Sequence, residues 1–289
     1  MNKRLRDLYD AKVPPSEGFK EASLFDGFRE AYTLHLSDNS LIMGHRLSEW
    51  TGHGPMLEQD IAMSNIALDL IGQSRNFYQY AALIKNSSAS PSGNGGGHGS
   101  GATEDSLAYL RDATEFKNIL LVELPNGDWA KTILKLFFFS TYQYFLYEKL
   151  IKSSDQQLSA IAEKSLKEVT YHVRWSSEWV IRLGDGTEES HKRLQNALDE
   201  LWDYTGEMFV PFDYENECVK NNIGIDVSTL KNDWNKKINE VFIEATLPSA
   251  YQEGQGMMSR GKKGMHTEHL VSILAEMQYL QRTYPGCEW

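Results

Sequence analysis

The segment 56–85 most constrains the fold, because it predicts one long helix that carries a row of polar side chains. Asn65, Asp69 and Gln73 stand at positions i, i+4 and i+8, so they share one face of that helix. Four apolar residues flank the row, and we therefore expect its amide and carboxylate to face the interior: Ile61, Ala62, Ile66 and Leu68. Buried polar side chains are costly unless they are paired. The row must accordingly find partners on another helix.

Helical periodicity recurs along the chain and predicts an all-α fold. Segments with a 3.6-residue apolar repeat are long, and the 289 residues include only 8 prolines, which argues against a β-sandwich or alternating β and α units. The predicted helices are 19–35, 39–51, 56–85, 104–122, 128–152, 155–183, 187–209, 228–246 and 265–283. Residues that favour helix N-termini stand at several starts, namely Asp38, Asp128, one of Ser153, Ser154 and Asp155, and Thr187.

Residues 1–289 are expected to form a single domain. The Gly/Ser-rich segment 87–103 predicts a flexible surface insertion, because six of the nine residues 93–101 are glycine, and His98 within it is expected to be solvated. Residues 210–227 predict an irregular connector that aromatic residues pack down.

Charge and cysteine content narrow the class of protein. The formal net charge of −11 argues against general nucleic-acid binding, which requires a basic surface. Cys218 and Cys287 are isolated, which suits a reducing compartment and argues against a cysteine-based metal site. Because no run reaches the roughly 18 apolar residues of a membrane span, we expect a cytoplasmic protein.

Glu168 and His172 on the predicted helix 155–183 are the expected partners of the polar row. A carboxylate and an imidazole one turn apart, facing similar groups on a second helix, are typical of di-iron bundles. Those bundles need a Glu from each of two helices and Glu-x-x-His from each of the other two. The sequence does not meet that requirement. We therefore expect a hydrogen-bonded network of Asn65, Asp69, Glu168 and His172, without a metal.

Other candidate ligand pairs have structural explanations. The single Glu-x-x-His, Glu188–His191, opens a helix after Thr187, where acidic residues suit the helix dipole. Glu49–His53 runs into a Gly-His-Gly-Pro helix end. His266-Thr-Glu-His269 offers two ligands, which make an incomplete metal site, and we expect it to be structural.

The segment 256–263 is close to a phosphate-binding loop, but it lacks the final Ser or Thr and a preceding strand. Arg260, Lys262 and Lys263 remain candidates for contact with an anion or an acidic partner surface. A solvated loop ahead of the last helix is the alternative.

Aromatic residues surround the predicted helix 128–152 on every side. Such a helix must be buried all round, by its own bundle or by another subunit. Trp175 and Trp179 at i, i+4 raise the same possibility, because large aromatic residues are common anchors of obligate interfaces. We therefore expect the partner-facing surface on the aromatic helices.

Five motifs resemble the family of C subunits of phenylacetyl-CoA 1,2-epoxidase complexes. They stand in order from about residue 30 to the C-terminus, and the glycine-rich segment 87–101 looks like an insertion relative to that family. The motifs occupy residues 45–50 (HRLSEW), 65–73 (NIALDLIGQ), 121–128 (LVELPNGD), 177–191 and 264–270 (GMHTEHL), followed by 275–278 and the terminal Tyr-Pro-Gly.

The resemblance implies a ferritin-like bundle in a hetero-oligomeric complex that epoxidises the ring of phenylacetyl-CoA during aerobic phenylacetate degradation. In such complexes the A subunit holds the di-iron centre, a separate reductase contains flavin and an iron–sulfur cluster, and the C subunit is structural. No catalytic residue is carried over. Asn65, Asp69, Glu168 and His172 are then the remnant of a metal site, paired with each other.

Two other functions stay open from the sequence. One is an active di-iron oxygenase with divergent ligands, so whether the chain itself is catalytic is undecided. The other is a free-standing module that binds the phosphates of CoA through the segment 260–263.

Overall fold

The computed structural model describes residues 17–88, 101–248 and 260–287, with side chains from residue 24 onward. These ranges contain helices and connecting turns and no strand, which confirms the all-α prediction. His98, most of the predicted insertion 87–103 and residues 256–259 lie outside the described residues. None of the helices in the described ranges is long and apolar enough to cross a membrane.

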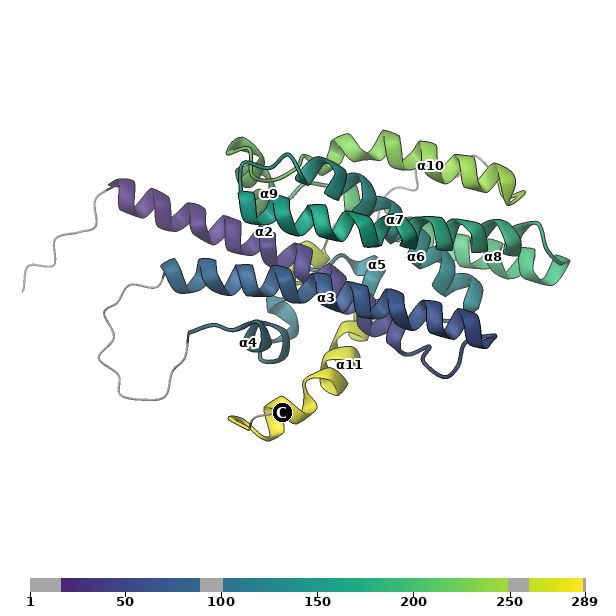
Figure 1. Cartoon of the computed structure of the whole chain (residues 1–289), viewed down its shortest axis with the longest axis horizontal. Helices are drawn as coiled ribbons and strands as arrows, with labels where there is room; N and C mark the ends of the chain where they lie inside the picture. Colours follow the sequence, from purple (N-terminus) through teal and green to yellow (C-terminus); the bar gives the residue numbers. More distant parts are fainter. Residues whose placement is uncertain (1–16, 89–100, 249–259, 288–289) are drawn as a thin grey trace, which may run out of the picture.

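Four long helices form the body of the molecule (Figure 1). They are α2 (Glu17–Ser48), α3 (Leu57–Ser88), α6 (Trp129–Leu150) and α7 (Gln156–Gly184). α2 packs mainly on α3 and α6 mainly on α7, while α3 also lies beside α7. Each hairpin is antiparallel, because only the short connections 49–56 and 151–155 join its two helices.

Short helices cover α2 and α6. α5 (Leu120–Glu123) and α9 (Asp213–Lys220) contact α2, while α8 (Glu188–Leu201) and α10 (Lys231–Glu244) contact both α6 and α7. The remaining helices are α4 (Glu104–Tyr109), α11 (Glu268–Met277) and α12 (Tyr279–Thr283), with 3₁₀ turns η1 (Ala113–Glu115), η2 (Trp202–Tyr204), η3 (Gly206–Phe209), η4 (Val227–Leu230) and η5 (Gly261–Lys263).

Three of the predicted N-caps are present. Asp128 accepts a hydrogen bond from the backbone N–H of Lys131 at 3.0 Å at the start of α6. Asp155 accepts from two backbone N–H groups at the start of α7. Thr187 accepts from the N–H of Ser190 at 3.1 Å at the start of α8. These side chains satisfy backbone donors that a helix leaves unpaired.

The predicted cap at Asp38 is wrong, because α2 continues through this position as one helix. The Asp38 carboxylate is fully buried, which is tolerable only with strong partners. Arg111 pairs with both of its oxygens, and the Tyr78 hydroxyl donates to it at 2.5 Å. The backbone N–H of Lys117 also donates to it, at 2.8 Å. Asp38 therefore fixes the segment that follows α4 across α2.

Three other predicted segments also differ from the structure, two helices and one connector. The stretch 104–122 is not one helix, because after α4 the chain extends across α2 and forms only η1 and α5. The helix predicted over 187–209 ends at residue 201 and continues as 3₁₀ turns. The connector 210–227 contains α9, which buries Tyr214 and Glu215. In each case tertiary contacts, invisible to periodicity, decide the local conformation.

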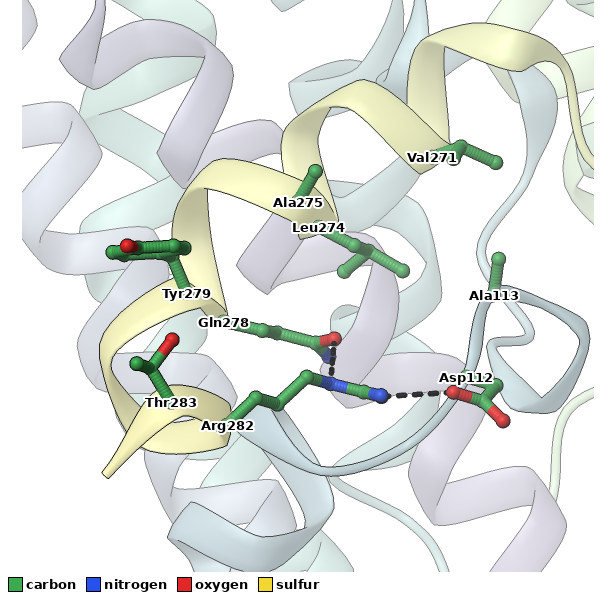
Figure 2. A pocket seen from close by; sticks show the side chains of 9 residues that line it. All are labelled: Asp112, Ala113, Val271, Leu274, Ala275, Gln278, Tyr279, Arg282 and Thr283. Atoms are coloured by element: carbon green, nitrogen blue, oxygen red, sulfur yellow. Dashed lines mark hydrogen bonds and ion pairs between the residues drawn. The ribbon is translucent and has the colours of Figure 1, made fainter. Parts of the chain in front are cut away.

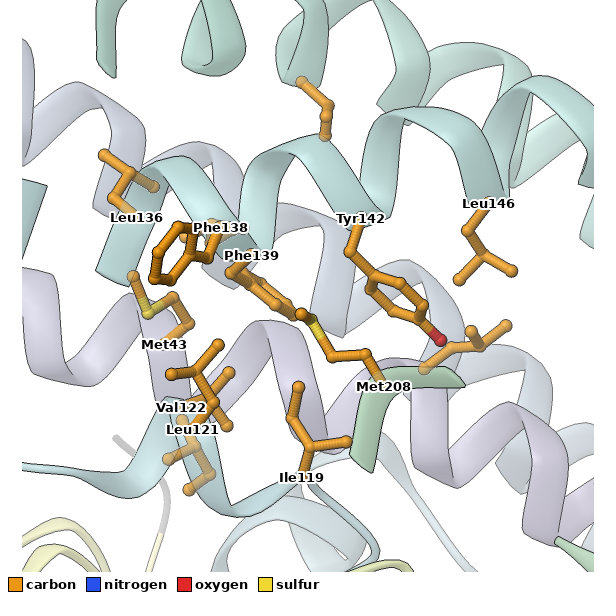
Figure 3. Close-up of a cluster of buried hydrophobic side chains, with 14 of the residues drawn as sticks. Met43, Ile119, Leu121, Val122, Leu136, Phe138, Phe139, Tyr142, Leu146 and Met208 are labelled. Atoms are coloured by element: carbon orange, nitrogen blue, oxygen red, sulfur yellow. The ribbon is translucent and has the colours of Figure 1, made fainter. Parts of the chain in front are cut away.

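The aromatic residues of α6 serve the core of this chain. Phe137, Phe138 and Phe139 are all 0% exposed. Figure 3 shows Phe138, Phe139 and Tyr142 of α6 above side chains from α2, the 119–122 segment and Met208. Trp175 and Trp179 are half-buried against Trp129, with ring centroids 6.0 and 5.6 Å apart. The expectation that aromatic helices form the partner surface is therefore wrong for α6.

Polar side chains fasten the C-terminal arm α11–α12. Gln278 donates to the carbonyls of Ala108 and Arg111, and Arg282 donates to Gln278, to backbone carbonyls and to Asp112. Figure 2 shows Gln278, Arg282 and Asp112 among the side chains that line a cavity of about 310 Å³ beneath the arm. Because both donors contact the protein itself, the residues that line the cavity offer no free cation to a ligand.

His266 joins the start of the arm to the 116–123 segment. Its Nδ1 donates to Glu123 at 2.9 Å and its Nε2 to the carbonyl of Phe116 at 3.0 Å. Burial disfavours the charged ring, but the hydrogen bond and charge of Glu123 and the Phe116 carbonyl outweigh it and raise the pKa of His266. Both ring nitrogens can donate at once only in the protonated form. The predicted structural role agrees with these contacts.

We expect Arg111→Met to lower the free energy of unfolding by about 3–5 kcal/mol, because it leaves a buried carboxylate without its counter-charge. Asp38→Leu combined with Arg111→Met should recover much of this loss. Urea unfolding followed by circular dichroism measures both. Arg193→Met is the control, since Arg193 pairs with Glu189 at the exposed surface. An equal midpoint shift in both arginine variants would contradict the assignment.

The pH dependence of stability should change in His266→Gln. A histidine whose folded pKa is raised contributes stability that is fully present below its unfolded pKa of about 6.5 and is lost as pH rises through the folded pKa. The wild type should therefore exceed the variant in stability at about pH 6, and by less at about pH 9. His53→Gln, at an exposed position, is the control. Parallel stability curves for wild type and His266→Gln would refute this prediction.

Candidate functional site between helices α3 and α7

The candidate site is the line along which α3 and α7 meet. His172 on α7 is fully buried, and its Nε2 donates to Asp69 Oδ2 on α3 at 3.0 Å. One turn further along α3, Gln73 Nε2 donates to Glu168 Oε2 at 2.9 Å. The two helices therefore bring together the predicted residues Asp69, Glu168 and His172, and they add Gln73 as a fourth.

Asn65 does not join this group, because its side chain is exposed. Residues four apart on a helix advance by about 40° around the axis, since 3.6 residues complete a turn. The row therefore winds from exposed Asn65 through half-exposed Asp69 to Gln73, which is 1% exposed. Two of the flanking apolar residues, Ile61 and Leu68, are likewise exposed, at 51% and 65%. The prediction that they mark an inward face is wrong.

Two further hydrogen bonds extend the line of contact in both directions. Trp179 Nε1 donates to Gln59 Oε1 at 2.9 Å, and the Tyr80 hydroxyl donates to the Asp155 carboxylate. Residue numbers rise along α3 as they fall along α7, so the four bonds form one antiparallel ladder. We call the pairs 59/179, 69/172, 73/168 and 80/155 the α3–α7 ladder. Sequence reasoning found only the centre of the ladder, because the outer pairs depend on how α3 and α7 are aligned in the folded chain.

The centre of the bundle between the other helices is lined by hydroxyl and amide groups. Gln143 of α6 donates to Ser40 of α2 and to the Tyr147 hydroxyl, at 3.2 Å in each case. Ser37 of α2 donates to the backbone carbonyl of Ser74 on α3 at 2.7 Å. These groups are weak ligands for iron, which in bundles of this kind requires carboxylates and histidines from all four helices.

The residues of this bundle do not fit a di-iron centre. Asp69 and Glu168 are each held by a partner of their own, His172 and Gln73. In the part of the chain that the structure describes, no group of three His, Cys, Asp or Glu side chains is placed to hold a metal ion. The arrangement pairs Asp69 with His172 and Glu168 with Gln73, while His172 Nδ1 and Gln73 Oε1 stay buried without a hydrogen-bond partner.

The other candidate pairs lie away from the bundle centre. His191 Nδ1 contacts the carbonyl of Gly184 at 2.8 Å, and Glu188 is exposed. Glu49 accepts from Arg46 and His53 is exposed. They have the local structural roles that their positions at helix ends predict.

The three basic side chains of the loop 260–263 differ in exposure, because one is buried and two are at the surface. Lys262 is fully buried, where its Nζ donates to both oxygens of Glu215 at 3.0 Å and to the carbonyl of Val210. It cannot reach an external anion, because η5 folds it under the chain. Arg260 and Lys263 are exposed, and only these two keep the predicted role of anion or partner contact.

The geometry defines a ferritin-like helical bundle: two antiparallel hairpins of long helices around a polar centre. The chain belongs to the phenylacetic acid catabolic protein family, whose model matches residues 28–289. It is 44% identical over 259 residues to the C subunit of 1,2-phenylacetyl-CoA epoxidase from Escherichia coli (strain K12). That alignment covers 90% of this chain and 98% of the relative. These matches confirm the resemblance that the sequence motifs indicate.

A double-mutant cycle tests the central pair of the ladder. Asp69→Ala and His172→Ala should be coupled by about 1 kcal/mol or more in the free energy of unfolding, as expected for side chains in direct contact. The matched control is the cycle of Asn65→Ala with His172→Ala, which should show no coupling, since Asn65 faces solvent. Equal coupling energies in the two cycles would contradict the direct contact between Asp69 and His172.

Proposed function

We propose that this chain is a non-catalytic structural subunit of a multicomponent phenylacetyl-CoA 1,2-epoxidase that acts in aerobic phenylacetate degradation. Its near full-length similarity to the C subunit of the Escherichia coli enzyme supports the assignment. The observation that carries the non-catalytic part is the internal pairing of Asp69 with His172 and of Gln73 with Glu168. Side chains that a metal would need are already bound to each other.

The ladder explains how the bundle stays folded without a metal. Polar groups left in the interior of a bundle are costly when unpaired, whereas a satisfied network stabilises one arrangement. The chain then presents a rigid helical surface to a hetero-oligomer. In this proposal the di-iron centre belongs to a catalytic A subunit, and flavin and the iron–sulfur cluster belong to a separate reductase subunit. The chain acts in the cytoplasm, as one domain, without nucleic acid or membrane.

Co-expression with an A-type subunit, followed by pull-down and metal analysis, tests the proposal. We expect the two chains to co-purify, with the iron in the A-type subunit. The chain purified alone should bind negligible iron, because its candidate ligands are paired. An A-type subunit that purifies and acts equally well without this chain would overturn the structural role.

The same metal analysis separates the alternative of an active di-iron oxygenase with divergent ligands. Near-stoichiometric iron in the purified chain, lost in the Glu168→Ala/His172→Ala double variant, would establish that alternative. Iron that survives the double variant would place the metal elsewhere and refute the remnant-site assignment. Asn65→Ala is the matched control, since it alters the same row outside the ladder.

A further inference from the structure

The layer formed by α3 and α7 leaves its outer side uncovered by the described elements. α3 contacts α2, α7 and the short helix α4, and the side chains that point away from these neighbours are exposed. The α3–α7 ladder holds the two helices side by side as one surface. The other layer, α2 and α6, is by contrast covered by α5, α8, α9 and α10, of which α8 and α10 also contact α7.

A row of large apolar side chains lies on the outer face of α3. Leu57, Ile61 and Leu68 are 72%, 51% and 65% exposed, and their spacing of four and seven places them along one side of the helix. Tyr171 on α7, 38% exposed, lies next to the ladder residue His172. Single exposed apolar residues need no explanation, whereas a row on one rigid face indicates a contact surface.

Gly72 continues this row one turn beyond Leu68. Glycine inside a helix is destabilising relative to alanine, so a mid-helix glycine needs a reason. The chain itself gives none, because nothing lies within 4 Å of the position that a Cβ atom would occupy. A side chain at this place would instead stand between α3 and whatever approaches its outer face. Close approach of another backbone at this place would explain the glycine.

The exposed charges of α7 border the row with an excess of cations. Four basic residues stand against two acidic ones, a local balance of +2 in a chain of formal charge −11. The exposed charged residues of α7 are Lys164, Lys167, Arg174 and Arg182, with Glu163 and Glu178. A basic ridge on an acidic protein favours a partner whose facing surface is acidic.

We infer that the outer face of the α3–α7 layer is the docking surface for the catalytic sister subunit, which presents a helical layer with an apolar row bordered by acidic side chains. The inference rests on the proposed function. The ladder spans about 33 Å at 1.5 Å per residue, and two helices are each about 10 Å wide. This gives about 660 Å², of the same order as the roughly 800 Å² that each partner buries in a stable interface.

A second copy of this chain fits the face less well. A two-fold axis perpendicular to α3 would match the apolar rows but would bring the two basic ridges to the same side, and a two-fold axis along α3 would leave both ridges outside the contact. Two chains of charge −11 also repel each other at long range. A sister subunit whose facing surface carries an apolar row bordered by acidic side chains matches both the row and the ridge.

Binding of the co-purified A-type subunit to single-residue variants tests the inference. Leu68→Asp should weaken binding at least about tenfold, since it places a charge in the desolvated row, and its exposure means that folding tolerates the change. Ile243→Asp is the matched control, because Ile243 on α10 is 67% exposed and belongs to neither the apolar row of α3 nor the basic ridge of α7. It should bind like the wild type. Thermal melts confirm that both variants fold.

Gly72 separates stability from docking. Gly72→Ala should raise the melting temperature of the isolated chain by about 2 °C, because alanine favours the helix and meets no neighbour. Gly72→Leu should leave the isolated chain folded and weaken binding to the A-type subunit. The double variant Lys167→Glu/Arg174→Glu should slow association and reduce its dependence on salt.

The outcomes distinguish the two proposals. If the wild-type pair does not form, the proposed function fails and this inference falls with it. If the pair forms and Leu68→Asp and Gly72→Leu bind as tightly as Ile243→Asp, only the docking face is overturned. Sedimentation of the chain alone tests the second copy: a dimer that Leu68→Asp dissolves, with A-type binding unchanged, also overturns the inference.

Discussion

The buried carboxylate of Asp38 is the interaction on which the covered half of the molecule depends. A charge in the middle of a buried helix must be neutralised, and Arg111, the Tyr78 hydroxyl and the Lys117 backbone do so together. The segment after α4 is thereby held across α2. Glu123 and His266 then attach the C-terminal arm to this segment, so one buried charge organises elements far apart in the sequence.

The opposite side of the bundle follows a different physical rule. There the α3–α7 ladder pairs polar groups directly across two helices, with one oxygen of Asp69 bonded to His172 and one oxygen of Glu168 bonded to Gln73. The same hydrogen bonds fix the register of α3 relative to α7 along the helix axes. This cross-helix pairing is consistent with the supporting role proposed for the chain, and the outer face of the two helices is the surface proposed for a partner.

The contrast between the two layers connects stability to assembly. α2 and α6 lie beneath other elements of the chain, and α6 buries Phe137, Phe138, Phe139, Tyr142 and Tyr147 completely. α3 and α7 keep apolar and basic side chains outside. The aromatic abundance of α6 therefore reflects the chain's own core, while the modest row on α3 is the better sign of an interface. Judged by aromatic composition alone, α6 would be the better candidate for a partner surface and α3 the weaker one.

The sequence by itself determined the helical class, the positions of α3, α6 and α7, and the caps Asp128, Asp155 and Thr187, because periodicity and capping are local properties. It also identified Asp69, Glu168 and His172 as partners. Only the tertiary structure decided that Asn65 faces solvent, that Asp38 lies inside one continuous helix and that Lys262 is buried against Glu215. Those three outcomes depend on which segment covers each helix face, and neighbours distant in the sequence set that coverage.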